Sequence, residues 1–544
     1  MDSNQSPETT PGRFHSILFT SPAVEAAQQR VETRELFHDL FLDRVFDAAY
    51  GALAPAARSP FDYGQQNANA EWRHETWVTM REVFCMPVLD VELARQRQEV
   101  ARDLQREEVA RPLRDFQSEI ASMRETLGRA KRASDRIEGQ GWLLEAAQTY
   151  CDALEQLQAG LDAAGPQSAM LGMLRVDLAV DRADPAHHAF RQRVADLRRD
   201  LGFIRYAVRI DGDRVTVLHD PAAEDYSAIV ARTFSRFRQG DVRDYRVRFG
   251  VETSMNHIEA EIVDRVALLY PELFSRLDQF SRQEADFADS RWLRLDRELP
   301  FYLSWWDFLR RLAAVGVRNC LPDLVAEGGS IDVADAVDLA LANQSAQAGQ
   351  GVVTNDFALR GAERMIVVTG PNHGGKTTLA RIFGQLHYIG SLGLPVTAIR
   401  AQLILPDRIL THFERSEAIA TQRGKLQDDL VRMHRILDVV SARSVVVMNE
   451  VFSSTSLDDA LWLGRRMMEK LKAVGCACIF VTFLDELATF DDDTVSMVAQ
   501  VDPADPTVRT YKVARKPADG RAYALTLAEK YRVTRAWLTR RIGA

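Results

Sequence analysis

Long apolar runs are missing from this chain of 544 residues. No stretch approaches the roughly 18 consecutive apolar residues that a membrane-spanning helix needs. The first residues, MDSNQSPETTPGRF, are polar and contain no apolar segment of the kind that marks a secretory signal peptide. These absences exclude a helical membrane protein and predict a soluble, cytoplasmic protein without a membrane partner.

Cysteine is scarce as well, and the five cysteines are scattered. Three of them are Cys85, Cys151 and Cys320, and the only close pair, Cys476 and Cys478, lies in the apolar run of residues 473–481. A Cys-x-Cys pair matches neither a zinc knuckle nor a Cys-x-x-Cys redox motif. We therefore expect buried, reduced thiols rather than a metal centre.

An excess of positive charge is also absent, since the formal net charge is -9. This balance argues against a protein whose whole surface attracts nucleic acid. Two segments are nevertheless basic: residues 236–248 hold five Arg and two Asp, and residues 505–544 hold ten Lys or Arg and three Asp or Glu. Each is either a solvated face with local ion pairs or a surface that contacts phosphate groups.

With 46% apolar and 27% charged residues, the composition is that of an ordinary folded protein. The length exceeds one compact core and, at about 150 residues per domain, indicates several domains. We predict a mainly helical N-terminal segment of unassigned role at residues 1–88, a helical core at residues 89–345 and a third domain at residues 346–544. The last boundary rests on the small, Gly- and Gln-rich residues 345–351.

The helical core contains one predicted β-hairpin. Between residues 109 and 127, apolar residues recur every three or four positions, which predicts a helix-packing seam with a restart or kink near Pro112. From Ile204 to Ile210 the apolar residues alternate with polar ones, Asp211-Gly212 supplies a turn, and Val215 and Val217 continue the alternation. This hairpin begins a predicted insertion at about residues 203–250.

Residues 301–308 contain a cluster of aromatic side chains. Exposed aromatic residues are typical of base-stacking platforms, whereas aromatic residues at near-helical spacing are typical of a core. We favour the core.

The strongest chemical motif lies at residues 370–378. An apolar strand pattern at residues 365–369 runs into G-x-x-x-x-G-K-T and then into a helical pattern, the context that a phosphate-binding loop requires. Glycines let backbone N–H groups surround phosphate oxygens, a lysine reaches the β- and γ-phosphates, and a hydroxyl binds Mg²⁺. We predict that Lys376 has the lysine role and Thr377 the hydroxyl role. The candidate nucleotide-binding residues are Gly370, Pro371, Asn372, His373, Gly374, Gly375, Lys376, Thr377 and Thr378.

A second apolar strand, residues 444–448, ends in Asn449-Glu450, where a Walker B strand places two acids. Glu450 is the candidate general base. Asn449 keeps a carbonyl oxygen for a metal shell but lacks the negative charge, so we expect weaker Mg²⁺ binding and slow hydrolysis. A third strand pattern follows at residues 477–482. Strands alternating with helices predict an α/β domain with a mostly parallel sheet, so the predicted fold class of the whole chain is mixed.

These motifs together resemble the MutS family of mismatch-repair ATPases. The Gly-Pro-Asn at the start of the loop is carried by few other P-loop proteins. The similar segments are Asn355-Asp356, residues 369–378, residues 407–411, Asn449-Glu450, residues 454–459, residues 481–483 and residues 519–529.

The resemblance implies an ABC-type ATPase domain that uses ATP and Mg²⁺, works as a homodimer and binds DNA. It implies nucleotide contacts at Asn355 and along the loop, a further metal role for Thr378, and the hydrolytic carboxylate at Glu450. The upstream helices with their hairpin resemble the lever and clamp of that family. The loop contributed by the partner protomer would lie near residues 414–425.

The chain departs from the family pattern at several positions. Asn449 stands where the family has Asp, Phe483 where it has His, and Phe452-Ser453 where it has Gly-Arg. The family's Phe-x-Glu mismatch-reading motif is not recognisable in residues 1–90.

Two hypotheses for function follow. In the first, ATP binding and hydrolysis close a dimer around DNA, in mismatch repair or related DNA maintenance. In the second, the chain is a nucleotide-gated protein scaffold with little hydrolysis and no direct mismatch recognition. Salt-dependent DNA affinity discriminates between them, because a protein that neutralises several phosphates loses affinity as salt rises.

Overall fold

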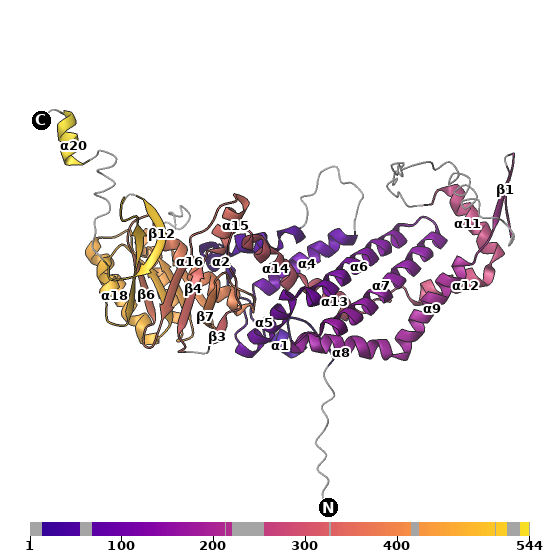
Figure 1. Ribbon diagram of the computed structural model, residues 1–544, viewed down its shortest axis with the longest axis horizontal. Helices are drawn as coiled ribbons and strands as arrows, with labels where there is room; N and C mark the ends of the chain where they lie inside the picture. The colour runs from indigo at the N-terminus through magenta and orange to yellow at the C-terminus, as the bar shows by residue number, and fades with distance from the viewer. Residues whose placement is uncertain are drawn as a thin grey trace, which may run out of the picture.

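The computed structural model describes residues 13–54, 68–212, 214–219, 255–325, 328–414, 424–505, 508–518 and 534–542. Its shape is elongated: the sheets lie at one end, long helices run through the middle, and the β1–β2 hairpin lies at the other end (Figure 1). The chain is mixed α/β and mostly helical, which confirms the predicted fold class in its coarse form.

The long helices pack in antiparallel fashion through the predicted seam. Of its residues, Val109, Leu113, Phe116, Ile120 and Met123 are buried. The helix restarts at Arg106, six residues before Pro112, and Pro112 packs against Gly160 of the neighbouring helix. The helices of this part are α5 (Val91–Gln105), α6 (Glu107–Arg132), α7 (Arg136–Ala164), α8 (Ala169–Ala183) and α9 (Pro185–Gly202).

The predicted hairpin is present at the far end of these helices. Strands β1 (Ala207–Asp211) and β2 (Arg214–Leu218) pair antiparallel, with Val208 opposite Val217 and Ile210 opposite Val215. The chain returns through α11 (His257–Leu269) and α12 (Pro271–Gln283). The basic segment at residues 236–248 lies outside the described residues.

The aromatic cluster belongs to the core, as its near-helical spacing in the sequence predicted. Phe301, Tyr302, Trp305, Trp306 and Phe308 lie on α14 (Pro300–Ala313) and all are buried. None of the five offers a ring face on which a base could stack.

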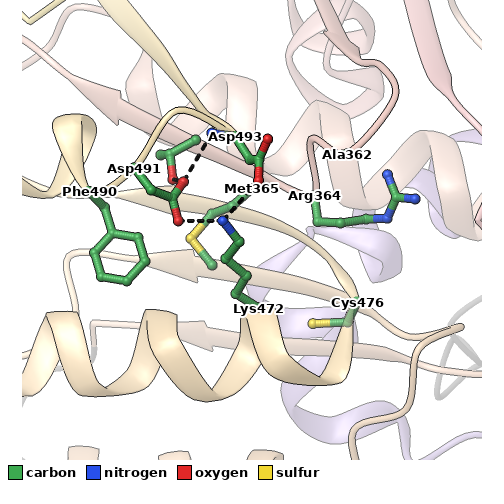
Figure 2. Close-up of a pocket in the computed structure, with 9 residues that line it drawn as sticks. Ala362, Arg364, Met365, Lys472, Cys476, Phe490, Asp491 and Asp493 are labelled. Carbon is green, nitrogen blue, oxygen red and sulfur yellow. Dashed lines mark hydrogen bonds and ion pairs between the residues drawn. The ribbon is translucent and has the colours of Figure 1, made fainter.

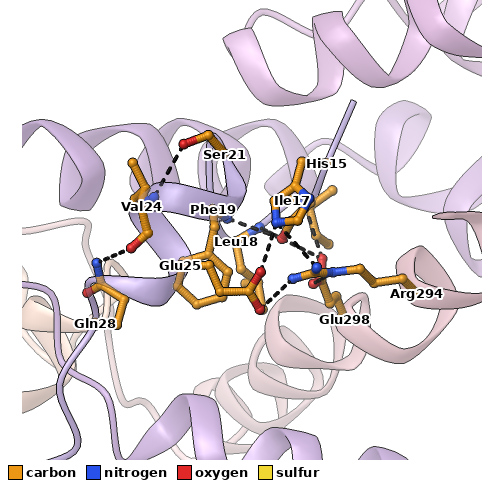
Figure 3. Close-up of polar contacts among 11 residues, drawn as sticks. His15, Ile17, Leu18, Phe19, Ser21, Val24, Glu25, Gln28, Arg294 and Glu298 are labelled. Atoms are coloured by element: carbon orange, nitrogen blue, oxygen red, sulfur yellow. Dashed lines mark hydrogen bonds and ion pairs between the residues drawn. The ribbon is translucent and has the colours of Figure 1, made fainter. Parts of the chain in front are cut away.

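The N-terminal segment is fixed to α13 (Ser290–Glu298) by a buried carboxylate (Figure 3). Glu298 Oε2 accepts hydrogen bonds from Ser16 Oγ at 2.7 Å and from Ile17 N at 3.1 Å. Burial raises the pKa of Glu298, and Arg294, which donates to its other oxygen at 2.5 Å, opposes that shift. Arg294 also pairs with Glu25 at 2.8 Å.

The N-terminal segment is helical, as predicted, but it packs against the third domain and does not form a separate unit. Leu40 O accepts a hydrogen bond from Gln385 Nε2 at 2.9 Å, and Phe84 O accepts one from Tyr388 Oη at 2.5 Å. Gln385 and Tyr388 belong to the helix that follows the phosphate-loop motif, so the segment forms one core with the third domain. Its elements are α1 (Pro22–Ala26), α2 (Thr33–Asp39), α3 (Leu42–Tyr50), η1 (Gly51–Leu53) and α4 (Ala68–Phe84).

The third domain contains a six-stranded sheet in the order β12-β11-β6-β10-β9-β8. Every neighbouring pair is parallel except β11 and β12, as the alternation of strands and helices predicted. Cys476 and Cys478 are buried here, as predicted. The strands are β6 (Met365–Thr369), β8 (Ile409–Phe413), β9 (Val445–Asn449), β10 (Ala477–Val481), β11 (Thr494–Val501) and β12 (Arg509–Arg515), and the helices are α16 (Lys376–Ser391), α17 (Lys425–Val439), α18 (Leu457–Val474), η2 (Asp485–Thr489) and α20 (Arg535–Ile542).

A second sheet, in the order β3-β7-β4-β5, corrects the boundary placed at residue 346. Strands β3 (Asp323–Val325) and β4 (Ile331–Ala336) precede that boundary, yet they pair with β7 (Arg400–Ile404) and β5 (Asn355–Leu359). The Gly- and Gln-rich residues 345–351 only join α15 (Leu339–Gln347) to β5. Composition alone does not distinguish a loop within a sheet from a linker between domains.

Candidate nucleotide site

The loop between β6 and α16 forms a tight turn at the carboxyl end of the parallel strands. Gly370 and Gly375 have φ angles of 107° and 95°, which L side chains rarely adopt. A Cβ atom at Gly374 would lie 2.9 Å from Pro371 O and 2.8 Å from Ala499 Cβ. Glycine is therefore required at these three positions. The loop lies at the N-terminus of α16, where backbone N–H groups and the helix dipole favour an anion.

Lys376, the first residue of α16, folds back into this loop. Its Nζ atom donates hydrogen bonds to Gly370 O at 2.8 Å, Pro371 O at 3.3 Å and Asn372 Oδ1 at 3.3 Å. Burial lowers the pKa of Lys376, and the nearby Glu450 carboxylate opposes the shift. A buried ammonium group held by neutral oxygens is well placed to bind an anionic ligand.

Phe483 lies two residues after β10 and faces the same ammonium group. Lys376 Nζ lies 5.0 Å from the centre of the Phe483 ring, within the range of a cation–π contact. Phe483 is 49% exposed, so it borders the open side of the loop. An apolar ring that cannot donate a hydrogen bond therefore lies beside the Lys376 ammonium group.

Thr377 and Asn449 meet at the end of β9. Thr377 Oγ1 donates a hydrogen bond to Asn449 Oδ1 at 2.9 Å, so the two predicted metal-binding side chains are brought together. Thr378 follows on α16 and is half-buried. Both oxygens of the Thr377–Asn449 pair are uncharged.

Glu450 follows Asn449 in a left-handed conformation with φ of 56°. Burial raises the pKa of its carboxyl group, Lys376 opposes this shift, and the neighbouring Glu414 raises the pKa further. Glu414 is held by Ser453 Oγ at 2.9 Å and by the ammonium group of Lys425. These two contacts lower the pKa of Glu414, so this carboxylate places negative charge beside Glu450.

Asn355 lies beside the loop without entering it. Its buried side chain accepts a hydrogen bond from Val513 N at 2.7 Å and donates one to Tyr511 O at 3.2 Å. Tyr511 O in turn lies 3.1 Å from the position of a Cβ atom at Gly375. Asn355 therefore fixes β12 against the loop.

Tyr511 of this site was missed from the sequence, and Glu414 was assigned only to the loop of the partner protomer at residues 414–425, of which residues 415–423 lie outside the described residues. Tyr511 has a φ of 58° and is 53% exposed, and its backbone packs against Gly375 of the loop. No local motif marks it, because β12 reaches the loop only through sheet pairing. Glu414 could have been found from strand pairing, since Phe413 of β8 is in register with Asn449 of β9.

A separate small cavity lies at the opposite, amino end of β6 (Figure 2). Lys472 bridges Asp491 at 2.5 Å and Asp493 at 3.0 Å beside Met365. The cavity measures about 10 Å³, which leaves no room for a nucleotide.

Two kinds of feature are absent from the part of the chain that the structure describes. No helix in it is long and apolar enough to cross a membrane. Among the same residues, no group of three or more His, Cys, Asp or Glu side chains is placed to hold a metal ion.

Comparison with known proteins agrees with the geometry of this site. Residues 366–539 match the protein-family model for MutS domain V. The chain is 32% identical over 188 residues to the DNA mismatch repair protein MutS of Erythrobacter litoralis, a match that covers 34% of this chain and 21% of that protein. It is 26% identical over 442 residues to the endonuclease MutS2 of Thermus thermophilus, covering 76% of this chain and 56% of that protein.

A third relative, the DNA mismatch repair protein MutS of Sorangium cellulosum, is 29% identical over 239 residues, which is 43% of this chain and 26% of that protein. The chain thus spans a fifth to a little over half of the length of these relatives. The family-model match lies within the domain that carries the loop.

Proposed function

Because the chain is a MutS-family protein, we propose that it binds ATP with Mg²⁺ at residues 370–378, hydrolyses it slowly and uses the nucleotide to control binding to DNA. The observation that carries the proposal is the buried Lys376 ammonium group inside a glycine loop at a helix N-terminus. In this proposal, phosphate oxygens take the place of Gly370 O and Pro371 O as partners of Lys376. Tyr511, whose backbone packs against the loop and whose side chain is exposed, is the residue that we propose to stack on the base.

The residues beside the loop fit a magnesium ion. Thr377 supplies a hydroxyl oxygen and Asn449 a carbonyl oxygen, and Mg²⁺ binds through oxygen ligands of this kind together with phosphates and water. A bound Mg²⁺ would neutralise charge that develops on the phosphates. The uncharged Asn449 makes this set weaker than one with an aspartate.

Glu450 is the residue that we assign to hydrolysis. It lies next to Asn449 at the carboxyl end of β9, and its carboxyl group faces Lys376. A carboxylate in this position can accept a proton from an attacking water, and a raised pKa brings such a base closer to neutral pH. Phe483 supplies no polar group toward the phosphates, which is why we expect the turnover to be slow.

DNA is the partner that we propose for the far end of the molecule. The hairpin lies at the opposite end from the loop, and its sequence carries Arg209 and Arg214 on exposed strands (Figure 1). In the proposed homodimer, the two hairpin arms would enclose the duplex, and the long helices α6 and α7 would connect them to the nucleotide sites.

Salt dependence of DNA binding tests this partner. Binding of the protein with ATP and Mg²⁺ to matched, mismatched and branched duplexes of equal length should fall steeply with salt, by about 10³-fold between 50 and 200 mM if about six phosphates are contacted. The measurement is fluorescence anisotropy at several salt concentrations. Binding that does not depend on salt, or no binding to any duplex, would contradict the proposal. The ranking of the three duplexes would show whether mispairs or junctions are preferred.

The alternative is a nucleotide-gated protein scaffold. Asn449 and Phe483 favour it, because both remove groups that support hydrolysis. In that case ATP would control dimer contacts in the absence of DNA. The anisotropy of the labelled duplexes would then not change when the protein is added.

The substitution Asn449→Asp is expected to strengthen metal binding. A carboxylate adds one negative charge to the oxygen set beside Thr377, so the Mg²⁺ concentration for half-maximal ATPase activity should fall by about tenfold, or about 1.4 kcal/mol. The measurement is ATPase rate against Mg²⁺ concentration for both proteins. Identical curves would exclude Asn449 from the metal shell. Asp438→Asn, a change at an exposed position of α17 away from the loop, serves as the reference.

A further inference from the structure

Helix α17 (Lys425–Val439) lies between the turn that carries Glu450 and the N-terminal helix α2 (Thr33–Asp39). Two of its residues, Asp429 and Arg432, are three positions apart and therefore lie on neighbouring parts of one helical face. Asp429 contacts the turn after β9, and Arg432 contacts α2. The role of α2 is not explained by nucleotide binding, and neither is that of these two charges.

Asp429 holds the turn through a buried carboxylate. Its Oδ2 atom accepts a hydrogen bond from Phe452 N at 3.3 Å, and its Oδ1 atom lies 3.3 Å from Nε2 of the fully buried His412. Asp429 is 7% exposed, so replacing it by an apolar residue leaves the Phe452 N–H group without this acceptor in a dry environment.

The turn at residues 450–452 needs a stabilising contact of the kind that Asp429 provides. Glu450 and Phe452 have φ angles of 56° and 64°, in the left-handed region that costs non-glycine residues free energy. Phe452 is buried in a core cluster with Met448 and Leu487. A turn with two left-handed non-glycine residues persists only where its surroundings hold it, and the Phe452 side chain and the Asp429 carboxylate both do so.

Arg432 ties the same helix to β8 and to the N-terminal segment. Its guanidinium group donates to Phe413 O at 3.0 Å and lies 3.4 Å from Asp39 Oδ2. Asp39 Oδ2 also accepts a hydrogen bond from Thr411 Oγ1 at 2.8 Å. The Asp39 side chain is fully buried, although it comes from a helix more than 370 residues earlier in the chain.

We propose that Asp429 is a positioning residue that fixes the turn carrying Glu450, and that Asp39 holds the helix bearing Asp429 in place through Arg432 and Thr411. The inference rests on the proposed ATPase function. According to this inference, the N-terminal segment contributes to hydrolysis without contacting the nucleotide. Helix α2 fixes the position of α17, and α17 in turn fixes the position of the Glu450 carboxylate. Neither aspartate contacts the loop at residues 370–378, so ATP binding does not depend on them.

The test compares kcat and KM for ATP in Asp429→Ala, Asp429→Leu and Asp429→Asn. Leucine fills the buried space without an acceptor, whereas asparagine keeps an acceptor for Phe452 N. We expect the alanine and leucine variants to lose about tenfold in kcat with unchanged KM, because the position of Glu450 changes and the phosphate loop does not. The asparagine variant should recover most of the rate.

The link to the N-terminal segment is tested by Asp39→Ala and by the double variant with Asp429→Ala. We expect Asp39→Ala to lower kcat at unchanged KM, and the double variant to lose no more than the more damaged single variant, because both residues act through α17. Asp438→Asn is the matched control, since Asp438 lies on the same helix but is exposed, and it should keep the parent kcat.

Parent-like kcat in both Asp429→Ala and Asp429→Leu would overturn the inference. A parallel loss of kcat and ATP affinity in these variants would also overturn it, since that pattern indicates general structural damage. Turnover by the parent chain is measured first: its absence would refute the proposed ATPase function, whereas turnover with unaffected variants would refute only the inference.

Discussion

Replacing Lys376 by alanine is expected to lower the affinity for ATP by about 100-fold, equivalent to about 3 kcal/mol. In the structure the ammonium group is held by Gly370 O, Pro371 O and Asn372 Oδ1. These neutral oxygens are weaker partners than the charged phosphate oxygens that we propose, because a full negative charge attracts the ammonium group more strongly than a carbonyl dipole does. The measurement is titration with a fluorescent ATP analogue.

Lys472→Ala provides the control for this variant. Lys472 also pairs with oxygen atoms at the edge of the same sheet, but at the opposite end of β6 from the loop (Figure 2). ATP affinity should be unchanged in this variant. An unchanged affinity in Lys376→Ala, with the fold intact by circular dichroism, would show that the nucleotide does not bind at residues 370–378.

The substitution Glu450→Gln is expected to lower the ATPase rate by about 10³-fold while ATP affinity stays within about twofold of the parent value. Glutamine keeps the size and one acceptor oxygen but cannot take a proton from water. It also removes one member of the Glu414–Glu450 pair. Single-turnover hydrolysis separates this chemical step from product release.

Glu469→Gln is the reference for the same change of side chain, because Glu469 is exposed on α18 and pairs with Arg466. It should leave the rate unchanged. Equal rates in Glu450→Gln and the parent would remove Glu450 from the hydrolytic role and would give weight to the scaffold alternative.

The local sequence predicted those parts of the structure that depend on neighbours in the chain. The hairpin at residues 207–218 follows from a period of two and an Asp-Gly turn. The phosphate loop follows from glycines at positions where a Cβ atom would meet backbone or side-chain atoms, as at Gly374. The buried strands β6, β9 and β10 follow from short apolar runs flanked by helical patterns.

The errors arose where distant segments meet. Strands β3 and β4 carry no motif, and they joined the wrong predicted domain because their partners β5 and β7 come later in the chain. The N-terminal segment was given no role because Asp39 is one aspartate among many in the sequence. Its importance comes from a buried contact with Thr411 and Arg432 that no local pattern records.

The sequence by itself determined that a glycine loop, a lysine and a hydroxyl stand between a strand and a helix, and that an asparagine and a glutamate end a second strand. These features depend on spacing along the chain, which folding does not change. Only the tertiary structure decided that Thr377 meets Asn449, that Phe483 faces Lys376, and that α17 connects the N-terminal segment to the turn of Glu450. Such contacts depend on the packing of segments far apart in the chain, and burial strengthens those made by Asn449 and Asp429.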